Sequence, residues 1–154
     1  MFNLLWAKFS PTAVVPTKEA HNAGFDIYVD HTQLGLSEMY VLAPNETKRF
    51  DTNIGYVIPE EYVAIVKQRS SHGKLPIFVG SGVCDSSYRN QVGVYITNTS
   101  DKPVQIDLTK AIAQILFIKV EHCGKSDYIE TTPQEFAELY PSDRGLGREG
   151  STNK

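Results

Sequence analysis

The 154-residue sequence is short of several features that mark particular classes of protein. Its two cysteines, Cys84 and Cys123, have neither the density of a disulfide scaffold nor the spacing of a metal site. We expect both to pack as small apolar residues in a reducing compartment. No run approaches the roughly 20 apolar residues of a membrane helix, and the first residues lack a basic start followed by a long apolar stretch. These absences predict a cytoplasmic protein.

An excess of positive charge is also missing. Lysine and arginine total 15, aspartate and glutamate total 18, and the formal net charge is −3. We therefore expect no direct binding to nucleic acid or to a membrane surface through bulk charge. An anionic ligand would have to be held by local positive groups. The length suits one domain with a single core.

The sequence does contain many short stretches rich in Val, Ile, Tyr and Phe, separated by glycine and proline. In residues 102–108, Val104, Ile106 and Leu108 alternate with polar residues, which is the period of a half-buried strand. Residues 98–103 are rich in turn formers and predict a hairpin-like connection. Further strands are predicted within residues 60–68, 92–98 and 111–120. So many short strands predict an all-β protein, a β-sandwich or barrel of the jelly-roll kind.

A single short helix is predicted near the C-terminus. Thr132 supplies an N-cap, Pro133 suits the first helical position, and Glu135 completes a capping box. The chain beyond this helix contains almost nothing that could build a core. We therefore divide the sequence into a β domain, residues 1–140, and a flexible C-terminal arm, residues 141–154.

Several polar groups stand where a ligand could use them. KQRSSHGK, residues 67–74, places two hydroxyls after an arginine at the end of a predicted strand, although such letters also form ordinary turns. Asp26 and Gln114 lie inside apolar strands, where an ion pair with arginine or a bond to an edge backbone group would satisfy them without a ligand. The arm carries glycines and phosphate-compatible donors at Arg144, Arg148, Ser151 and Thr152.

In their order along the chain, these stretches resemble the five motifs of the homotrimeric dUTP pyrophosphatases (dUTPases). The matching stretches are AGFDIY at 23–28, RSSHGK at 69–74, GVCDSSYRNQVGV at 82–94, AIAQILF at 111–117 and RGLGREGST at 144–152. The resemblance implies a jelly-roll subunit and a homotrimer with active sites at subunit boundaries, each closed by another subunit's C-terminal arm. It implies hydrolysis of dUTP to dUMP and pyrophosphate, which limits uracil in DNA and supplies dUMP for thymidylate synthesis.

The same resemblance implies roles for single residues. Asp85 would be the general base, because an ionised aspartate can take a proton from the water that attacks the α-phosphorus. Tyr88 would pack against deoxyribose, unless it is simply a core tyrosine. Mg²⁺ would clamp the triphosphate oxygens, with Asp26 contributing through water. The other substrate contacts implied are backbone at Gly82, Val83 and Gly93 for uracil, and Arg69, Ser70, Ser71, Gln114, Arg144, Arg148, Gly150 and Ser151 for the phosphates and the closing arm.

The fifth motif departs from the family pattern, because Arg148 and Glu149 stand where glycine and phenylalanine are usual. The usual aromatic cover over uracil is missing, and we expect Arg148 to cover uracil or reach a phosphate instead. Two other functions stay open. A dCTP deaminase shares the fold and the second motif, but residues 82–94 match the hydrolase. An inactive scaffold that binds a regulatory protein is disfavoured because Asp85, Ser70 and Gln114 are all present.

Overall fold

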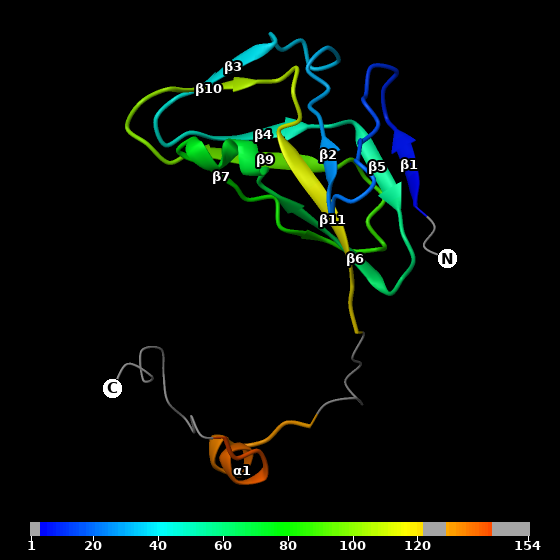
Figure 1. Ribbon diagram of the computed structural model, residues 1–154, viewed down its shortest axis with the longest axis vertical. Helices are drawn as coiled ribbons and strands as arrows, with labels where there is room; N and C mark the ends of the chain where they lie inside the picture. The colour runs from blue at the N-terminus through cyan, green and yellow to red at the C-terminus, as the bar shows by residue number, and fades with distance from the viewer. Residues whose placement is uncertain (1–3, 122–128, 143–154) are drawn as a thin grey trace. The chain divides into compact units, whose positions relative to one another are not determined.

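Strands of three to seven residues make up most of the regular structure, apart from the two-residue β8. The structure, a computed structural model, describes residues 4–121 and 129–142, which belong to two units, residues 1–121 and 122–154. All the described strands lie in the first unit (Figure 1). In chain order its elements are β1 (Leu5–Lys8), β2 (Phe25–Ile27), β3 (Met39–Leu42), β4 (Thr47–Asp51), β5 (Ile54–Val57), β6 (Tyr62–Lys67), the 3-10 helix η1 (Ser70–Lys74), β7 (Ile77–Val79), β8 (Val83–Cys84), β9 (Gly93–Asn98), β10 (Val104–Asp107) and β11 (Ala113–Lys119).

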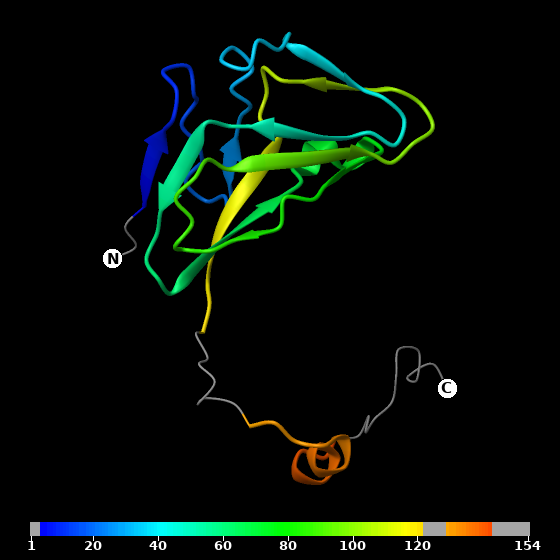
Figure 2. The ribbon, with the colours of Figure 1, turned by 180° about the vertical axis from the view of Figure 1, so that it is seen from behind.

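The strands pair antiparallel in every sheet that the described residues form. The two larger sheets have the orders β2-β11-β6-β8 and β4-β9-β7, and the two smaller ones pair β1 with β5 and β10 with β3. Figure 2 shows the same sheets from behind. The strands predicted within residues 60–68, 92–98, 102–108 and 111–120 correspond to β6, β9, β10 and β11. The predicted all-β, jelly-roll class with one short helix is confirmed.

The core forms where the apolar faces of the strands meet. Phe50 on β4 and Val94 and Ile96 on β9 are fully buried, as is Ile115 on β11. Alternation along a strand sends neighbouring side chains to opposite faces. The residues beside these core positions therefore lie on the outer face of β4 and β9, and this face lines part of the site described below.

The connection after β9 is not the predicted hairpin. β9 pairs with β4 and β7, whereas β10 pairs with β3, so residues 98–103 cross from one sheet to another. Asn98, fully buried, holds this crossing: its Nδ2 donates to the carbonyls of Leu42, Ala43 and Lys102 at 3.2, 3.0 and 2.7 Å. The turn-forming residues do change the chain direction, but they do not specify which strand β10 pairs with.

The second unit contains α1 (Pro133–Leu139) within its described residues. The predicted capping box is confirmed: the backbone N–H of Glu135 donates to the Thr132 hydroxyl at 3.2 Å, and the Thr132 N–H donates to the Glu135 carboxylate at 3.0 Å. The predicted domain boundary after residue 140 stays a prediction, and most of the predicted arm, residues 143–154, lies outside the described residues. None of the described helices has the length and apolar character needed to cross a membrane.

Candidate active site

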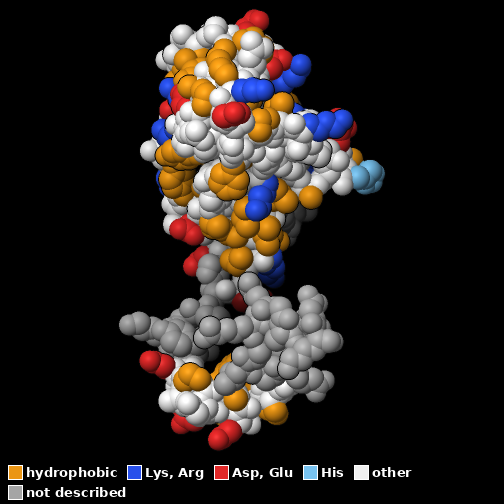
Figure 3. All heavy atoms as spheres, turned by 90° about the vertical axis from the view of Figure 1, so that its left-hand side faces the viewer, with side chains coloured by type: hydrophobic (Ala, Val, Ile, Leu, Met, Phe, Trp, Pro, Cys, Tyr) orange, Lys and Arg blue, Asp and Glu red, His pale blue; other side chains and the backbone are white. Residues whose placement is uncertain are grey.

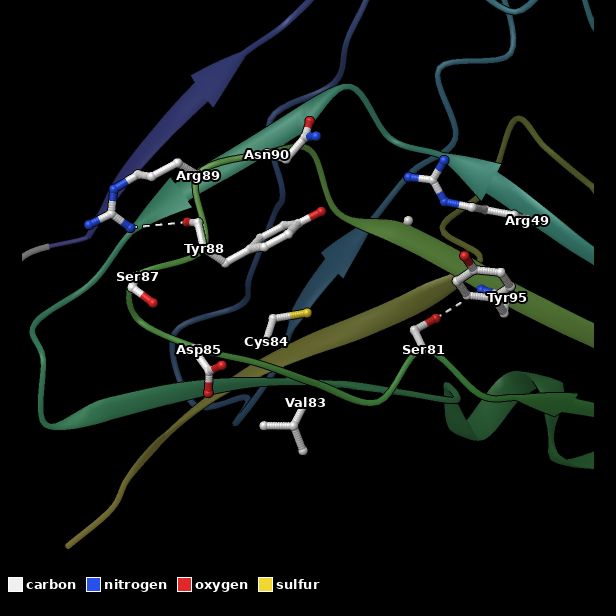
Figure 4. A pocket seen from close by; sticks show the side chains of 11 residues that line it. Arg49, Ser81, Val83, Cys84, Asp85, Ser87, Tyr88, Arg89, Asn90 and Tyr95 are labelled. Carbon is white, nitrogen blue, oxygen red and sulfur yellow. Dashed lines mark hydrogen bonds between the residues drawn. The ribbon is translucent and has the colours of Figure 1, made fainter. Parts of the chain in front are cut away.

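Residues 81–95 surround a pocket of about 680 Å³ beside β8 and β9 (Figure 4). The backbone at the start of this segment is held by Tyr56, a buried residue of β5. The Tyr56 hydroxyl donates to the main-chain carbonyls of Cys84 and Asp85, at 3.0 and 3.2 Å. The pocket is lined by Arg49, Ser81, Val83, Cys84, Asp85, Ser87, Tyr88, Arg89, Asn90, Gly93 and Tyr95.

Asp85 presents an exposed carboxylate at this pocket. Its backbone carbonyl also accepts a hydrogen bond from the N–H of Tyr88 at 3.1 Å, which closes a turn directly after β8. Within the described part of the chain, no hydrogen bond or ion pair engages the carboxylate oxygens. The arrangement therefore combines a fixed backbone with a side chain that is free to accept a proton.

The neighbouring thiol and phenol are held in their neutral forms. Burial raises the pKa of the Cys84 thiol, the charge of Asp85 raises it further, and the Tyr56 hydroxyl opposes them in part. Burial is also the main cause that raises the pKa of Tyr56, with the nearby Cys84 and Asp85 adding to it. Since a thiolate is the reactive form of cysteine, Cys84 is unsuited to act as a nucleophile. Cys84 instead packs against the core, as predicted, while Cys123 lies outside the described residues.

Tyr88 is not a core tyrosine. Its side chain is exposed at the pocket, and its hydroxyl donates to the backbone carbonyl of Gln91 at 2.9 Å. Figure 4 shows the ring reaching across the pocket above Cys84. A ring fixed at its tip offers a flat apolar surface to a ligand.

Gly93 turns its main-chain groups toward the pocket. It stands opposite Asp51 in the β4–β9 ladder, and the next pair bonds through Thr52 N–H and the Val92 carbonyl at 3.3 Å. Because bonded and non-bonded pairs alternate in an antiparallel ladder, the N–H and C=O of Gly93 point away from β4. Tyr95, two residues along, confirms this direction: its N–H donates to Ser81 Oγ and its C=O accepts from the Gly80 N–H.

A second pocket, of about 270 Å³, contains the polar residues of the first, second and fourth motifs. The Arg69 guanidinium bonds both carboxylate oxygens of Asp26, at 2.9 and 2.8 Å, and donates to the Ala111 carbonyl at 3.0 Å. Asp26 thus has the arginine partner that its place in an apolar strand requires. Gln114, opposite Asp26 in the β11–β2 ladder, donates from Nε2 to the Gln68 carbonyl at 3.0 Å. The pocket is lined by Asn22, Ala23, Gly24, Asp26, Arg69, Ser70 and Gln114.

The predicted residues therefore fall into two groups. Val83, Asp85, Tyr88 and Gly93 line the first pocket, and Asp26, Arg69, Ser70 and Gln114 line the second. Ser71 and Gly82 line neither pocket. Gly82 instead has a φ of 74°, which favours glycine, and its carbonyl accepts from the Val66 N–H. Arg144, Arg148, Gly150 and Ser151 lie outside the described residues.

The two pockets share no lining residue. Cys84 pairs with Ala64 on one side of β6, and Gln114 pairs with Lys67 on the other. From ordinary strand rise and spacing, the Cα atoms of Cys84 and Gln114 are about 14 Å apart. Arg49, Ser81 and Tyr95 also line the first pocket, although they are not among the predicted site residues. No local pattern marks Arg49, which reaches it only through the pairing of β4 with β9.

The described residues form no cluster of three or more His, Cys, Asp or Glu side chains that could hold a metal ion by itself. Asp26, the predicted contributor to a magnesium site, has both oxygens bonded to Arg69. A carboxylate retains further lone pairs, so contact through a water molecule remains open to it. A magnesium ion would need most of its ligands from a bound phosphate chain and from water.

Known proteins match most of the chain. The dUTPase family model matches residues 11–152. The deoxyuridine 5'-triphosphate nucleotidohydrolase of Fowlpox virus (strain NVSL) is 33% identical over 147 residues, 94% of this chain and 93% of the relative. A dCTP deaminase of Natronomonas pharaonis is 30% identical over 76% of this chain and 60% of its own.

The fold agrees with these matches. The solved structure of Staphylococcus bacteriophage 80alpha dUTPase with dUPNHPP is similar at a TM-score of 0.73, covering 97% of this chain and 98% of that chain. Its sequence identity is 22%, so this likeness concerns the fold. With the family model matched from residue 11 to residue 152 and a viral relative aligned nearly end to end, this chain belongs to the dUTPase family.

Proposed function

We propose that the protein hydrolyses dUTP to dUMP and pyrophosphate. The observation that carries this proposal is the position of Asp85: an exposed carboxylate on an anchored backbone, in the pocket formed by the third family motif. The family match spans all five motifs, including those that supply the second pocket. The reaction would lower dUTP and supply dUMP.

Asp85 acts as the general base in this mechanism. A water molecule attacks the α-phosphorus while the Asp85 carboxylate accepts its proton. The bond from the α-phosphorus to the bridging oxygen breaks, and pyrophosphate leaves with the electron pair. Proton transfer to a positioned side chain of this kind contributes typically about 10² to 10⁴ in rate.

The backbone of Gly93 reads the base. Its C=O can accept from the N3–H of uracil and its N–H can donate to a neighbouring carbonyl oxygen, because both groups point away from β4. Neutral cytosine lacks the N3–H and would leave the C=O unpaired, a mismatch that can discriminate on the order of 10⁴-fold. The Tyr88 ring packs against deoxyribose, and packed backbone around the base excludes the methyl group of thymine.

The second pocket holds the phosphates. The Ser70 hydroxyl and the Gln114 amide supply donors, with Ser70 near the bridging oxygen and Gln114 at the α-phosphate. Arg69 retains two of its five N–H donors after its bonds to Asp26 and Ala111, so it would contact phosphate through these rather than through its bidentate edge. Ser71 adds a hydroxyl at the same turn. A Mg²⁺ ion, if bound to the phosphate chain with Asp26 contacting it through water, would supply positive charge that neutralises the triphosphate.

In this mechanism the two pockets form one active site across subunits of a trimer. Asp85 and Gln114 must both reach the α-phosphate region, yet they line separate pockets of one chain. Val41, Phe78 and Val83 are large apolar residues exposed on the first unit, and Figure 3 shows apolar side chains interspersed with charged ones on one face of that unit. Exposed apolar surface of this kind can be buried against another subunit. Arg144, Arg148, Gly150 and Ser151 then close the site from an arm.

A product assay tests the activity. The purified protein is incubated with Mg²⁺ and either dUTP or dCTP, and the products are separated by chromatography. dUMP and pyrophosphate from dUTP are the expected products. Ammonia released from dCTP would identify the second candidate, a dCTP deaminase, which the Natronomonas pharaonis relative favours. No reaction with either nucleotide would contradict both.

A further inference from the structure

Arg49 occupies a position at the first pocket that none of the family motifs accounts for. Phe50, its neighbour on β4, is fully buried, so Arg49 and Asp51 lie on the outer face of the sheet. The register places Tyr95 opposite Arg49 and Gly93 opposite Asp51. Arg49 is consequently a near neighbour of the glycine whose main-chain groups face the pocket.

The guanidinium of Arg49 lies directly against Gly93. A Cβ added to Gly93 would lie 2.9 Å from Nη2 and 3.0 Å from Cζ of Arg49, closer than ordinary carbon contacts allow. Only glycine at position 93 admits the guanidinium at this distance. Figure 4 shows Arg49 extending from β4 toward the pocket, above Ser81 and Tyr95.

Asp51 fixes the orientation of this guanidinium. Arg49 Nη2 forms an ion pair with the buried Asp51 Oδ1 at 2.8 Å, although its N–H is not aligned for a hydrogen bond to that oxygen. The ion pair leaves Nε and Nη1 of Arg49 without a hydrogen bond in the described part of the chain. Asp51 thus holds a planar, partly exposed cation over Gly93 while most of its donors stay available to a ligand.

We propose that Arg49 is a substrate-binding residue that covers the pyrimidine ring held by Gly93. The inference rests on the proposed function, because it takes the base to be bonded to the N–H and C=O of Gly93. A base in that position continues the β4–β9 sheet, and the guanidinium lies on the outer face of this sheet, over its edge. Planar guanidinium groups stack on flat π systems, and an Arg-to-Lys change at such a stacked site is not conservative because the ammonium is a compact point charge.

Two other roles for Arg49 predict different ligand dependence. A cation that merely attracts phosphate would act more strongly on a triphosphate than on a monophosphate, and lysine would replace it. A purely structural ion pair with Asp51 would alter stability and leave nucleotide affinity unchanged. If Arg49 contacts the ring, its loss lowers the affinity for every uracil nucleotide by the same factor, and lysine at position 49 does not restore that affinity.

Titration calorimetry on the full chain separates these roles. The ligands are dUMP and the α,β-imido analogue of dUTP, and the variants are Arg49→Ala, Arg49→Lys and Lys48→Ala. If Arg49 stacks on the base, both Arg49 variants lose that contact and should bind each ligand about tenfold more weakly. Lys48→Ala is the matched control: it removes a positive charge from the adjacent position of β4, where the half-buried Lys48 lies over the Tyr40 ring and lines neither pocket, so its affinity should stay within about twofold of the parent.

The outcomes are distinct. Unchanged affinity in Arg49→Ala, full affinity in Arg49→Lys, or a much larger loss for the triphosphate analogue would each overturn the inference. If Arg49→Ala does not fold, Arg49→Lys, which keeps the ion pair with Asp51, decides alone. A parent protein that binds neither ligand would instead contradict the proposed function.

Discussion

Two aspartates, Asp85 and Asp30, have contrasting surroundings, and these surroundings suit them to different roles. Asp85 is exposed and its carboxylate has no partner within the described residues, whereas Asp30 is buried among donors. Asp30 accepts from Thr12 at 2.7 Å, from Asn53 Nδ2 at 2.9 Å and from the hydroxyl of Ser10. The exposed Asp85 is suited to accept a proton, whereas the hydrogen-bonded Asp30 is suited to stabilise the folded protein.

Replacing Asp85 by asparagine should abolish most of the turnover. The amide has nearly the same shape but cannot accept the proton, so kcat should fall about 10²- to 10⁴-fold. Affinity for dUMP, measured by calorimetry, should stay close to that of the parent. Asp101→Asn, at an exposed aspartate outside both pockets, serves as the control. Turnover of Asp85→Asn close to the parent value would show that another group takes the proton.

Asp30 should make stability depend on acid pH. Burial raises the pKa of Asp30, but hydrogen bonds from Ser10, Asn53, Thr12 and the Gln33 backbone outweigh it and hold this pKa below its usual value. A lowered folded-state pKa stabilises the protein above the unfolded-state pKa, and the contribution disappears as pH falls through the folded-state value.

The test is urea unfolding of the parent and Asp30→Asn at pH 7 and pH 3. The variant should be less stable at pH 7, because an amide nitrogen would face hydrogen-bond donors. The difference in unfolding free energy should narrow only below about pH 4, where an ordinary aspartate becomes protonated. A difference that is the same at both pH values would rule out the ionised carboxylate as its source.

Among the elements, the crossing from β9 to β10 depends on one side chain. Besides its three donated bonds, Asn98 accepts from the backbone N–H and the hydroxyl of Ser100, at 3.0 and 2.8 Å. These bonds satisfy backbone groups that neither sheet pairs. The Asn98 side chain thereby supplies hydrogen bonds in place of the backbone ladder that a β9–β10 hairpin would have formed.

Asn98→Ala should lower the unfolding free energy by about 2 kcal/mol or more, because it leaves buried carbonyls without donors. Chemical denaturation measures this change. Thr99→Ala, at the next and exposed position, should alter it by less than about 0.5 kcal/mol. Equal effects at the two positions would mean that the network around Asn98 contributes little.

For the molecule as a whole, the two pockets of one chain are separate and share no lining residue. Asp85 and Gln114 line pockets with no residue in common, so if both act on the α-phosphate as proposed, a complete site requires two chains or a large rearrangement within one. A mixture of two inactive variants distinguishes these cases. Light scattering first establishes whether each variant forms a trimer.

Asp85→Asn and Gln114→Ala should each be nearly inactive alone. After joint unfolding and refolding at equal concentrations, random assortment gives about a quarter of the sites both native residues if Asp85 and Gln114 come from different subunits. dUTP hydrolysis should then recover toward that fraction of the parent rate. Activity that stays at the level of the separate variants would place the site within one chain.

Much of this architecture could be read from local patterns. The alternation of Val104, Ile106 and Leu108 predicted β10, and Thr132 with Glu135 predicted the start of α1. Both signals are local: period-two burial and capping each involve residues only a few positions apart. The ordered motifs likewise predicted that Asp85 and Tyr88 would stand at a pocket.

Other features depend on which strands become neighbours, and short-range patterns do not encode this. The local sequence of residues 98–103 is compatible with β10 pairing with β9 or with β3, and only the fold selects β3. Asp26 required some partner, but only the fold brings Arg69 to it across 43 positions. Arg49 meets Gly93 solely through the register of β4 and β9. The sequence by itself determined β6, β9, β10, β11, the helix and the motif residues, because their signals are local. Tertiary pairing decided the ion pairs, the division into two pockets and the position of the Arg49 cation against Gly93.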